Sequence, residues 1–275
     1  MPTLDLKNRV VIITGAGRGI GREFARVLAR SGCRLALVAR SSAELADAEQ
    51  EVRALGASAI AIRADVAEPA DCDRVATLTL ERFGRIDALV NNAGIGMRRV
   101  SETFNTVPVK FWEVAPDAFA DIMTINTFGP FFMTRAVAPA MLAQGFGRIV
   151  NVSTSAVTMV RPGYLPYGPS KAALEAMSRT MAAQLDGTGV TVNVLLPGGA
   201  TDTALLPGAG PGRRGADGQL LPADIMNPLL AWLVSDASGG INGRRFIGKL
   251  WDAALPPGEA AVRCMSPHPD LPAIL

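Results

Sequence analysis

The sequence has a single histidine, His268, in a chain of 275 residues. Catalytic zinc sites usually draw on imidazole ligands, and a Ser-His-Asp triad needs a histidine held in a structured site. His268 lies in a proline-rich tail, so the chain has no histidine for either a zinc site or a catalytic triad within a structured site. The sequence therefore excludes zinc alcohol dehydrogenases and triad hydrolases, and we expect no bound metal.

Cysteine is also scarce. Cys33, Cys72 and Cys264 are odd in number and far apart, which argues against a disulfide framework and for a reducing compartment. The opening residues MPTLDLKNRVVIITG lack the pattern of a signal peptide, and no apolar run is long enough to span a membrane. We therefore expect a cytoplasmic protein with no membrane partner.

Net charge is low, at +2, the arginines are scattered, and aromatic residues make up only 5% of the chain. These features argue against a nucleic-acid groove and against a polybasic membrane patch. The expected partner is a small, uncharged or weakly charged molecule. Because 49% of the residues are hydrophobic, a chain of this length can fill one α/β domain with a large core.

Apolar runs of strand length recur along the chain, and a helical pattern follows each of the first three. The strand-like runs are 9–14, 34–39, 59–64, 87–94, 148–154, 190–199 and 244–251, and the helical patterns are 19–31, 42–55 and 69–83. Continuous β-branched runs alternating with amphipathic helices predict a parallel sheet covered on both faces. The expected fold is a doubly wound, Rossmann-type α/β domain over residues 1–252.

Three segments depart from this alternation of strands and helices. Residues 95–120 are long for a strand-to-helix connection, and residues 205–223 are rich in Gly and Pro. Loops of this length are either functional lids or simply mobile. Residues 253–275 carry five prolines, and we expect them to form an irregular C-terminal tail.

The stretch TGAGRGIG, Thr14 to Gly21, follows the first strand and opens a helix. Glycine lets the backbone approach a pyrophosphate, and the helix N-terminus offers free N–H groups to the anion. The third glycine of the G-x-G-x-x-G fingerprint falls on Ile20, so the spacing is T-G-x-x-x-G-x-G. A tight turn without a ligand is the alternative, but the place in a doubly wound sheet favours a dinucleotide.

The end of the second strand usually decides between NAD and NADP, because an acid there binds the ribose 2′-OH and an arginine accommodates a 2′-phosphate. This strand ends in Ala39 and Arg40 with no acid, and Arg18 in the glycine turn is placed to reach the same phosphate. Two charge-assisted hydrogen bonds of about 1.5–3 kcal/mol each would give a clear preference. We expect NADP(H) rather than NAD(H), with two surface arginines as the alternative.

Tyr167 is followed four residues later by Lys171, and this spacing puts both side chains on one face of a helix. Lowering the tyrosine pKa from about 10 by about three units takes about 4 kcal/mol. A cation about 4 Å away, at an effective dielectric of about 20, supplies about that much. The pair predicts a general acid or base. Tyr164 has Gly168 at the same offset, so it is expected to be a pocket wall or a packing residue.

These motifs, with NNAG at 91–94 and YGPSK at 167–171, resemble those of the short-chain dehydrogenase/reductase family, in its shorter single-domain branch. The match runs in order from Thr14 to about Asp252. The resemblance implies hydride transfer between a nicotinamide cofactor and a carbonyl or secondary alcohol, with Tyr167 as general acid or base. It also implies that Lys171 tunes Tyr167 and binds the nicotinamide ribose, and that subunits form a homotetramer or homodimer through the helix beginning at Tyr167.

The resemblance further implies cofactor contacts for the pyrophosphate turn, the adenine, the cofactor wall and the nicotinamide end. In that order, they are Gly15, Arg18, Gly19, Ile20 and Gly21; Asp65 and Val66; Asn92, Ala93 and Gly94; and Pro197, Gly198, Thr201 and Thr203. Asn126, in MTINTFG, matches the asparagine that anchors a water in the family's proton relay.

In the resembling family, a hydroxyl that polarises the carbonyl lies thirteen residues before the catalytic tyrosine, and the same count from Tyr167 falls on Thr154. The family residue is usually serine, but threonine donates and accepts hydrogen bonds as serine does. If Thr154 faces the cofactor cleft, strand alternation turns Ser153 and Ser155 away. A bulge at the strand end would bring Ser155 in instead. Thr154 is therefore the preferred candidate, Ser155 the alternative and Ser153 a structural hydroxyl.

The chain departs from the family pattern in two places. The segment between NNAG and Asn126 is longer than usual, which suggests an enlarged wall beside a ring-shaped or medium-sized apolar substrate, with Met97, Phe104, Phe111 and Trp112. Arg98 and Arg99 in that segment would bind an acidic substrate or stay solvated. GKLWD replaces the usual terminal glycine pair, so subunit contacts at that end are not carried over.

Two other functions share parts of this pattern. Extended-type epimerases and dehydratases also carry Tyr-x-x-x-Lys, but their glycine turn usually reads T-G-x-x-G-x-x-G and their chains are longer. A non-catalytic NADP-binding regulator would not need Tyr167, Lys171 and Asn126, which are all present. Turnover of carbonyl or alcohol substrates separates an oxidoreductase from a regulator.

Overall fold

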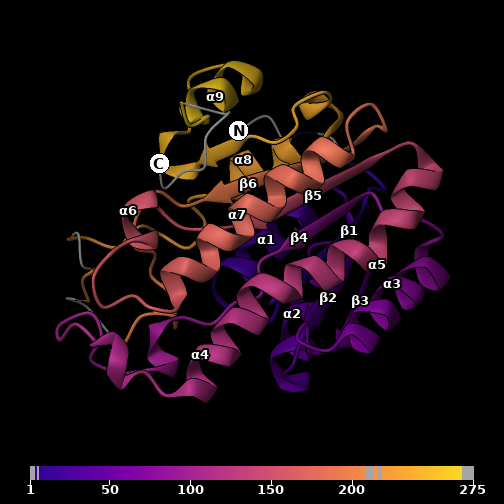
Figure 1. Cartoon of the computed structure of the whole chain (residues 1–275). Coiled ribbons are helices and arrows are strands. Elements are labelled where there is room, and N and C mark those ends of the chain that lie inside the picture. Colours follow the sequence, from indigo (N-terminus) through magenta and orange to yellow (C-terminus); the bar gives the residue numbers. More distant parts are fainter. Residues whose placement is uncertain (1–3, 5, 209–212, 216–217, 268–275) are drawn as a thin grey trace.

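The protein is described by a computed structural model that covers residues 4, 6–208, 213–215 and 218–267, so His268 lies outside the described residues. Seven parallel strands form one sheet in the order β3-β2-β1-β4-β5-β6-β7. Helices cover both faces of this sheet (Figure 1). The predicted doubly wound fold is confirmed.

The strands and helices alternate through the first two thirds of the chain. The strands are β1 Val10–Thr14, β2 Arg34–Ala39, β3 Ala59–Arg63, β4 Ala88–Asn91, β5 Gly147–Val152, β6 Val190–Leu196 and β7 Arg245–Ile247. The helices are α1 Gly19–Arg30, α2 Ser42–Ala54, α3 Pro69–Phe83, α4 Pro116–Met123, α5 Gly129–Gln144, α6 Ala156–Met159, α7 Tyr167–Gln184, α8 Asn227–Leu233 and α9 Pro257–Cys264.

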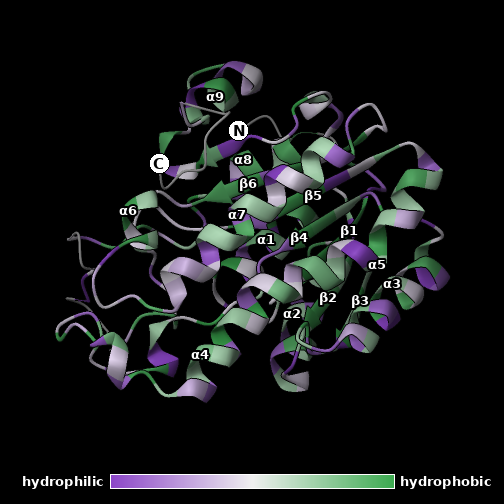
Figure 2. Cartoon of the chain, viewed as in Figure 1, coloured by the Kyte–Doolittle hydropathy of each residue, from purple (hydrophilic) through white to green (hydrophobic). Residues whose placement is uncertain are grey.

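Each face of the sheet has its own hydrophobic core. Val11 and Ile13 of β1 point into the core that α1, α2 and α8 cover, while Ile12 points into the core beneath α3 and α5. Side chains alternate across a strand, so strands buried on both faces need apolar residues at every position. Figure 2 shows the strands as mostly hydrophobic, whereas the helices carry both hydrophobic and hydrophilic residues. This explains why continuous apolar runs marked the strands.

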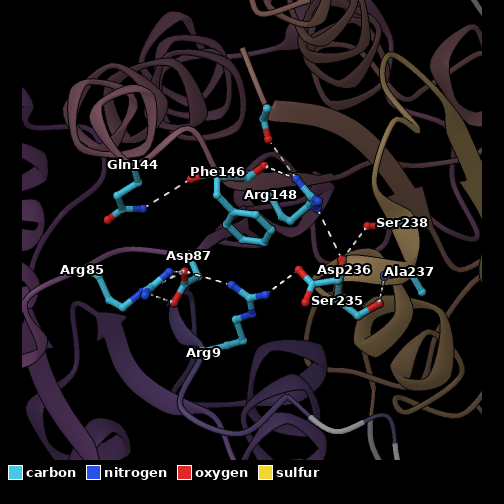
Figure 3. Close-up of polar contacts among 12 residues, drawn as sticks. Arg9, Arg85, Asp87, Gln144, Phe146, Arg148, Ser235, Asp236, Ala237 and Ser238 are labelled. Atoms are coloured by element: carbon cyan, nitrogen blue, oxygen red, sulfur yellow. Dashed lines mark hydrogen bonds and ion pairs between the residues drawn. The ribbon is translucent and has the colours of Figure 1, made fainter. Parts of the chain in front are cut away.

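A polar cluster ties the strands together at their amino ends (Figure 3). The buried Asp87 carboxylate accepts from Val10 N at 2.8 Å and from Arg85 at 2.6 to 3.0 Å. Arg9 and Arg148 each place a guanidinium carbon 4.2 Å from the centroid of the Phe146 ring. This cluster joins β1 to the chain around β4 and β5. The glycine turn and the start of α7 lie at the other, carboxyl ends of the strands.

We had expected residues 253–275 to form an irregular tail, but part of this segment is helical. Residues 257–264 form α9, which buries Ala260, Ala261 and Cys264 against the core. Proline is favourable at the start of a helix, so the two prolines at 256–257 begin α9 rather than prevent it. Beyond α9, Met265 forms an antiparallel bridge with Phe246, and the N–H of residue 266 donates to the Arg245 carbonyl at 2.8 Å.

The long segment 95–120 contains two short 3-10 turns, Met97–Arg99 and Phe111–Glu113, before α4 begins. The described part of 205–223 is tied to the sheet end by Leu221, whose N–H donates to the Ala200 carbonyl at 2.8 Å. Within the described ranges, no helix is both long enough and apolar enough to cross a membrane.

Candidate active site

A cavity of about 1120 Å³ opens at the carboxyl ends of the strands. Sixteen of the predicted site residues line it: Gly15, Arg18, Gly19, Ile20, Arg40, Asp65, Val66, Asn92, Ala93, Gly94, Thr154, Tyr167, Lys171, Pro197, Thr201 and Thr203. The other three predicted residues, Gly21, Asn126 and Gly198, lie behind its wall. Residues from opposite ends of the sequence thus meet at one site, as parallel strands dictate.

The glycine turn is compact enough to form an anion cradle. Gly15 and Gly19 have positive φ angles of 67° and 53°, in the left-handed region that favours glycine. A Cβ on Gly21 would lie 2.1 Å from the Gly15 carbonyl oxygen, so Gly21 lets α1 start directly beneath the turn. The N-cap, Arg18, makes no side-chain capping bond, and the first turn of α1 has no acid. These free N–H groups fit a pyrophosphate.

Asn92 joins the two cofactor motifs. Its side-chain Nδ2 donates to the carbonyls of Thr14 at 3.0 Å and Gly15 at 3.3 Å, and its N–H donates to the Thr14 hydroxyl at 3.0 Å. The NNAG segment is therefore fixed against the glycine turn. Asn92 supports the cradle as well as lining it.

We expect Gly21→Ala to weaken binding of a nicotinamide dinucleotide by at least about tenfold, because backbone must move where an added Cβ would overlap the Gly15 carbonyl. Fluorescence titration with NADPH measures the change. Gly258→Ala is the matched control, since a Cβ there meets nothing within 4 Å, and it should bind as wild type does. Unchanged affinity in Gly21→Ala would show that the turn tolerates a side chain.

Arg18 and Arg40 both line the cavity and both have carboxylate partners. Arg18 lies 3.3 Å from Glu44, and Arg40 lies 3.7 Å from Asp65. The two arginine side chains are 70% and 60% exposed, and exposed pairs contribute little, with a median of about 0–1 kcal/mol. A phosphate could therefore displace either carboxylate at small cost.

Tyr167, Lys171 and Thr154 come together where β5 meets α7. Tyr167 is the first residue of α7, and Lys171 lies one turn later. Both line the cavity together with Thr154, whose side chain lowers the pKa of the Tyr167 phenol. Lys171 is buried, and its Nζ donates to the Val152 carbonyl at 2.9 Å. Gly94 is close to this group, since a Cβ there would lie 3.7 Å from Lys171 Nζ.

The expected lowering of the Tyr167 pKa by Lys171 is wrong for this structure. Burial raises the pKa of Tyr167 to about 12, and the hydrogen bond with Thr154 opposes the rise. Burial also lowers the pKa of Lys171 to about 8, against the attraction of Glu175. Desolvation penalises both the Tyr167 phenolate and the Lys171 ammonium. The sequence analysis considered only the attraction between these two charges and not the cost of burying them. Tyr167 consequently carries its proton at neutral pH in the free protein.

Asn126 lies in a π-helical turn, Thr124–Phe128, between α4 and α5. Its Oδ1 accepts from Ile95 N at 2.9 Å, and its Nδ2 donates to the Ile95 carbonyl at 2.9 Å and to the Ser170 hydroxyl at 3.1 Å. Both N–H bonds of the amide are thus used in fixing the chain beside Gly94 to α7. Its part in a water relay stays a prediction.

The hydroxyls around Thr154 have separate roles. Ser155 is the N-cap of α6 and accepts from Thr158 N at 3.2 Å, while Ser153 is buried. The strand ends at Val152, two residues before the end we had expected, so strand alternation does not decide which hydroxyl faces the cavity. Ser153 and Ser155 line the cavity beside Thr154, so the expectation that they turn away from the cleft is wrong.

The substrate end of the cavity is only partly the wall expected from the sequence. Met97 and Phe104 are buried and line it, and Phe104 packs edge-on against Tyr164 with ring centroids 5.6 Å apart. Phe111 and Trp112 are 66% and 69% exposed and lie outside the lining, so that expectation is wrong. Their 3-10 turn is short and places them in contact with each other, 5.0 Å between centroids.

Arg98 and Arg99 pair with acids rather than stand free. Arg98 bonds Glu102 at 2.9 Å, and Arg99 bonds Asp117 and Asp121 at 2.8 Å each. The sequence analysis also missed cavity residues that have no motif to mark them, among them Ser41, Glu44, Thr158, Arg161, Leu205 and Leu206. Only the Gly/Pro-rich composition around 205–223 gave any signal, for Leu205 and Leu206.

Comparison with known proteins places this arrangement in one family. The model of the short chain dehydrogenase family matches residues 9–212. A 3-oxoacyl-(acyl-carrier-protein) reductase of Synechocystis sp. is 37% identical over 194 residues, which are 70% of this chain and 74% of that protein.

Solved structures agree with the sequence comparison. A short-chain type dehydrogenase/reductase from Mycobacterium marinum superposes with a TM-score of 0.76 at 27% identity, over 88% of this chain and 94% of that one. A metagenomic short-chain oxidoreductase in complex with NADP gives a TM-score of 0.68 at 28% identity, over 84% and 92% of the two chains. The chain therefore belongs to the short-chain dehydrogenase/reductase family of nicotinamide-dependent oxidoreductases.

Proposed function

We propose that the protein is an NADP(H)-dependent oxidoreductase that interconverts a carbonyl and a secondary alcohol on a small, largely apolar molecule. The observation that carries this proposal is that Thr154, Tyr167 and Lys171 line the same cavity as the glycine turn at the N-terminus of α1. The named reductase activity of the Synechocystis relative supports a carbonyl substrate.

In this proposal the glycine turn and α1 hold the pyrophosphate, and Arg18 and Arg40 face the 2′-phosphate. A nicotinamide held there would supply the chemistry of hydride transfer to or from the substrate carbon. Thr154 donates a hydrogen bond to the carbonyl oxygen, and Tyr167 gives that oxygen its proton. Lys171 contacts the nicotinamide ribose and stabilises the phenolate that remains on Tyr167.

The cofactor preference is testable at one position. Because no acid ends β2 and Arg40 follows Ala39, we expect a higher kcat/KM with NADPH than with NADH. Ala39→Asp should shift the ratio toward NADH by at least about tenfold, since the new carboxylate accepts from a ribose hydroxyl and repels a 2′-phosphate. Ala39→Asn is the matched control without the charge and should shift it less. Equal kcat/KM for both cofactors in the wild type would refute the assignment.

The function itself is tested by NADPH oxidation and NADP reduction against ketones, quinones, sugars, acyl thioesters and secondary alcohols. Turnover is expected with an apolar member of this panel, because Met97, Phe104 and Leu205 line the substrate end. Tight NADPH binding without oxidation across the whole panel would favour the non-catalytic regulator.

We further propose a cytoplasmic location and a homodimer or homotetramer formed through α7. Light scattering on the purified protein measures the oligomeric state directly. A monomer at micromolar concentration would overturn the proposed assembly but would not affect the proposed reaction.

A further inference from the structure

Behind the cavity wall, a buried ion pair joins α7 to β7. Glu175 lies one turn after Lys171 on α7 and is 7% exposed. Arg245, the first residue of β7, donates from Nε to the two carboxylate oxygens of Glu175 at 3.0 and 3.2 Å. Neither residue lines the cavity, and the mechanism above uses neither.

Arg245 also holds the chain beyond the end of β5. Its Nη2 donates to the backbone carbonyl of Thr154 at 2.9 Å. Thr154 lies two residues past the last residue of β5, so this bond anchors a residue that the strand no longer holds. The planar, forked guanidinium lets one side chain bind a carboxylate and a carbonyl at once, which an ammonium group does less well.

Glu175 is the carboxylate that acts on Lys171. The two residues are four apart on α7, a spacing that makes them neighbours on the helix surface. Burial lowers the pKa of Lys171, and attraction to Glu175 raises it. In the described part of the chain, the ionisable groups around Lys171 are Tyr167 one turn earlier, Glu175 one turn later, and Arg245 of β7 beyond Glu175.

Fold stability alone gives little reason for this pair. Desolvation of two charges often cancels their attraction, and apolar side chains of similar volume commonly serve as well in such a place. The pair instead connects two residues of the proposed site, Thr154 through its carbonyl and Lys171 through its charge. Its placement is explained if both connections matter to the reaction.

We propose that Glu175 and Arg245 are positioning residues for the reaction: Arg245 fixes Thr154 so that its hydroxyl stays in the cavity with Tyr167, and Glu175 keeps the Lys171 ammonium charged inside the protein. The inference rests on the function proposed above. It predicts separate effects for the two partners, because they reach the site by different contacts.

Titration of the lysine side chains by NMR tests Glu175 in the free protein, without any turnover. The chain has only four lysines, and Lys171→Arg assigns the signal of Lys171. Glu175→Gln should lower the pKa of Lys171 by about one unit, since it removes a negative charge one helical turn away. Asp73→Asn is the matched control: it breaks the exposed Arg135 pair and should leave that pKa unchanged. An unchanged Lys171 pKa in Glu175→Gln would overturn the proposal.

Kinetics of Arg245→Lys test the second contact. The variant keeps the positive charge beside Glu175 but cannot hold Glu175 and Thr154 together in the same geometry. We expect kcat to fall by about tenfold or more, because a misplaced hydroxyl no longer meets the reacting oxygen, while KM for NADPH and the pKa of Lys171 stay near wild type. A purely structural pair would lower Tm without this split between kcat and KM. Wild-type kcat in Arg245→Lys would overturn the proposal.

The two measurements also separate this inference from the proposed function. If the wild-type protein reduces no carbonyl and oxidises no alcohol, the proposed function fails, and the positioning role of Arg245 in that reaction fails with it. The lysine titration still decides whether Glu175 maintains the charge on Lys171. If the wild type turns over but both variants match it, the ion pair is structural and the proposed function stands.

Discussion

Tyr167→Phe is expected to lower kcat by about 10²–10⁴-fold, the range that general acid–base catalysis contributes. The change removes the proton that the phenol would donate but keeps the ring, so the cavity should retain its shape. NADPH affinity should stay within about threefold of wild type, because the glycine turn that would hold the pyrophosphate lies on β1 and α1, away from α7. Steady-state kinetics with the best substrate of the panel and a fluorescence titration with NADPH measure the two quantities.

The matched control is Tyr164→Phe, which makes the same chemical change in the same cavity. Tyr164 packs against Phe104, and it has a glycine where Tyr167 has Lys171. Its loss of hydroxyl should cost less than about fivefold in kcat, since ring packing is retained. If Tyr167→Phe keeps more than half of the wild-type turnover, another group supplies the proton and the proposed mechanism is wrong.

Thr154→Val is expected to raise the activation free energy by about 2–4 kcal/mol, the scale for one donor to a developing oxyanion. Valine is nearly isosteric with threonine but has no hydroxyl. We favour this hydroxyl because Thr154 lines the cavity and lowers the pKa of Tyr167, whereas Ser155 caps α6. The loss should appear in kcat at saturating NADPH, with little change in the KM for NADPH.

Three substitutions distinguish the neighbouring hydroxyls. Thr154→Ser keeps the donor and should stay active, whereas Ser153→Ala and Ser155→Ala should each cost less than about tenfold in kcat. A crippled Ser155→Ala beside a fully active Thr154→Val would show that the count of thirteen residues points to the wrong hydroxyl. The carbonyl would then meet Ser155, and α6 would have to lose its cap when substrate binds.

The sheet was predictable because its strands are buried on both faces. Parallel strands that are buried on both faces, such as β1 with its run VVII, are mostly apolar along their length, and helices follow the first three of them. The site was predictable where a motif has a fixed spacing, as with Gly15 to Gly19 and with Tyr167 and Lys171. Such a spacing can be read from the sequence because backbone geometry fixes the number of residues between the positions of the motif.

Properties that depend on neighbours far along the chain could not be predicted in this way. The pKa of Tyr167 depends on how deeply the cavity wall buries it, and spacing carries no record of burial. The carboxylate partner of Arg40 lies on the loop after β3, and the exposure of Trp112 follows from a short 3-10 turn. Each of these is set by tertiary contacts that local patterns do not record.

The sequence analysis also missed α9, because a proline-rich composition is typical of an irregular segment and does not record the contacts that α9 makes with the core. Its docking has a consequence for how molecules of this protein meet. β7 is the last strand of the sheet, and a strand in that place offers a row of open backbone donors and acceptors to any passing chain. Met265 and the residue after it occupy part of that row. Residues 265 and 266 therefore cover part of an edge that would otherwise be open to pairing with another chain.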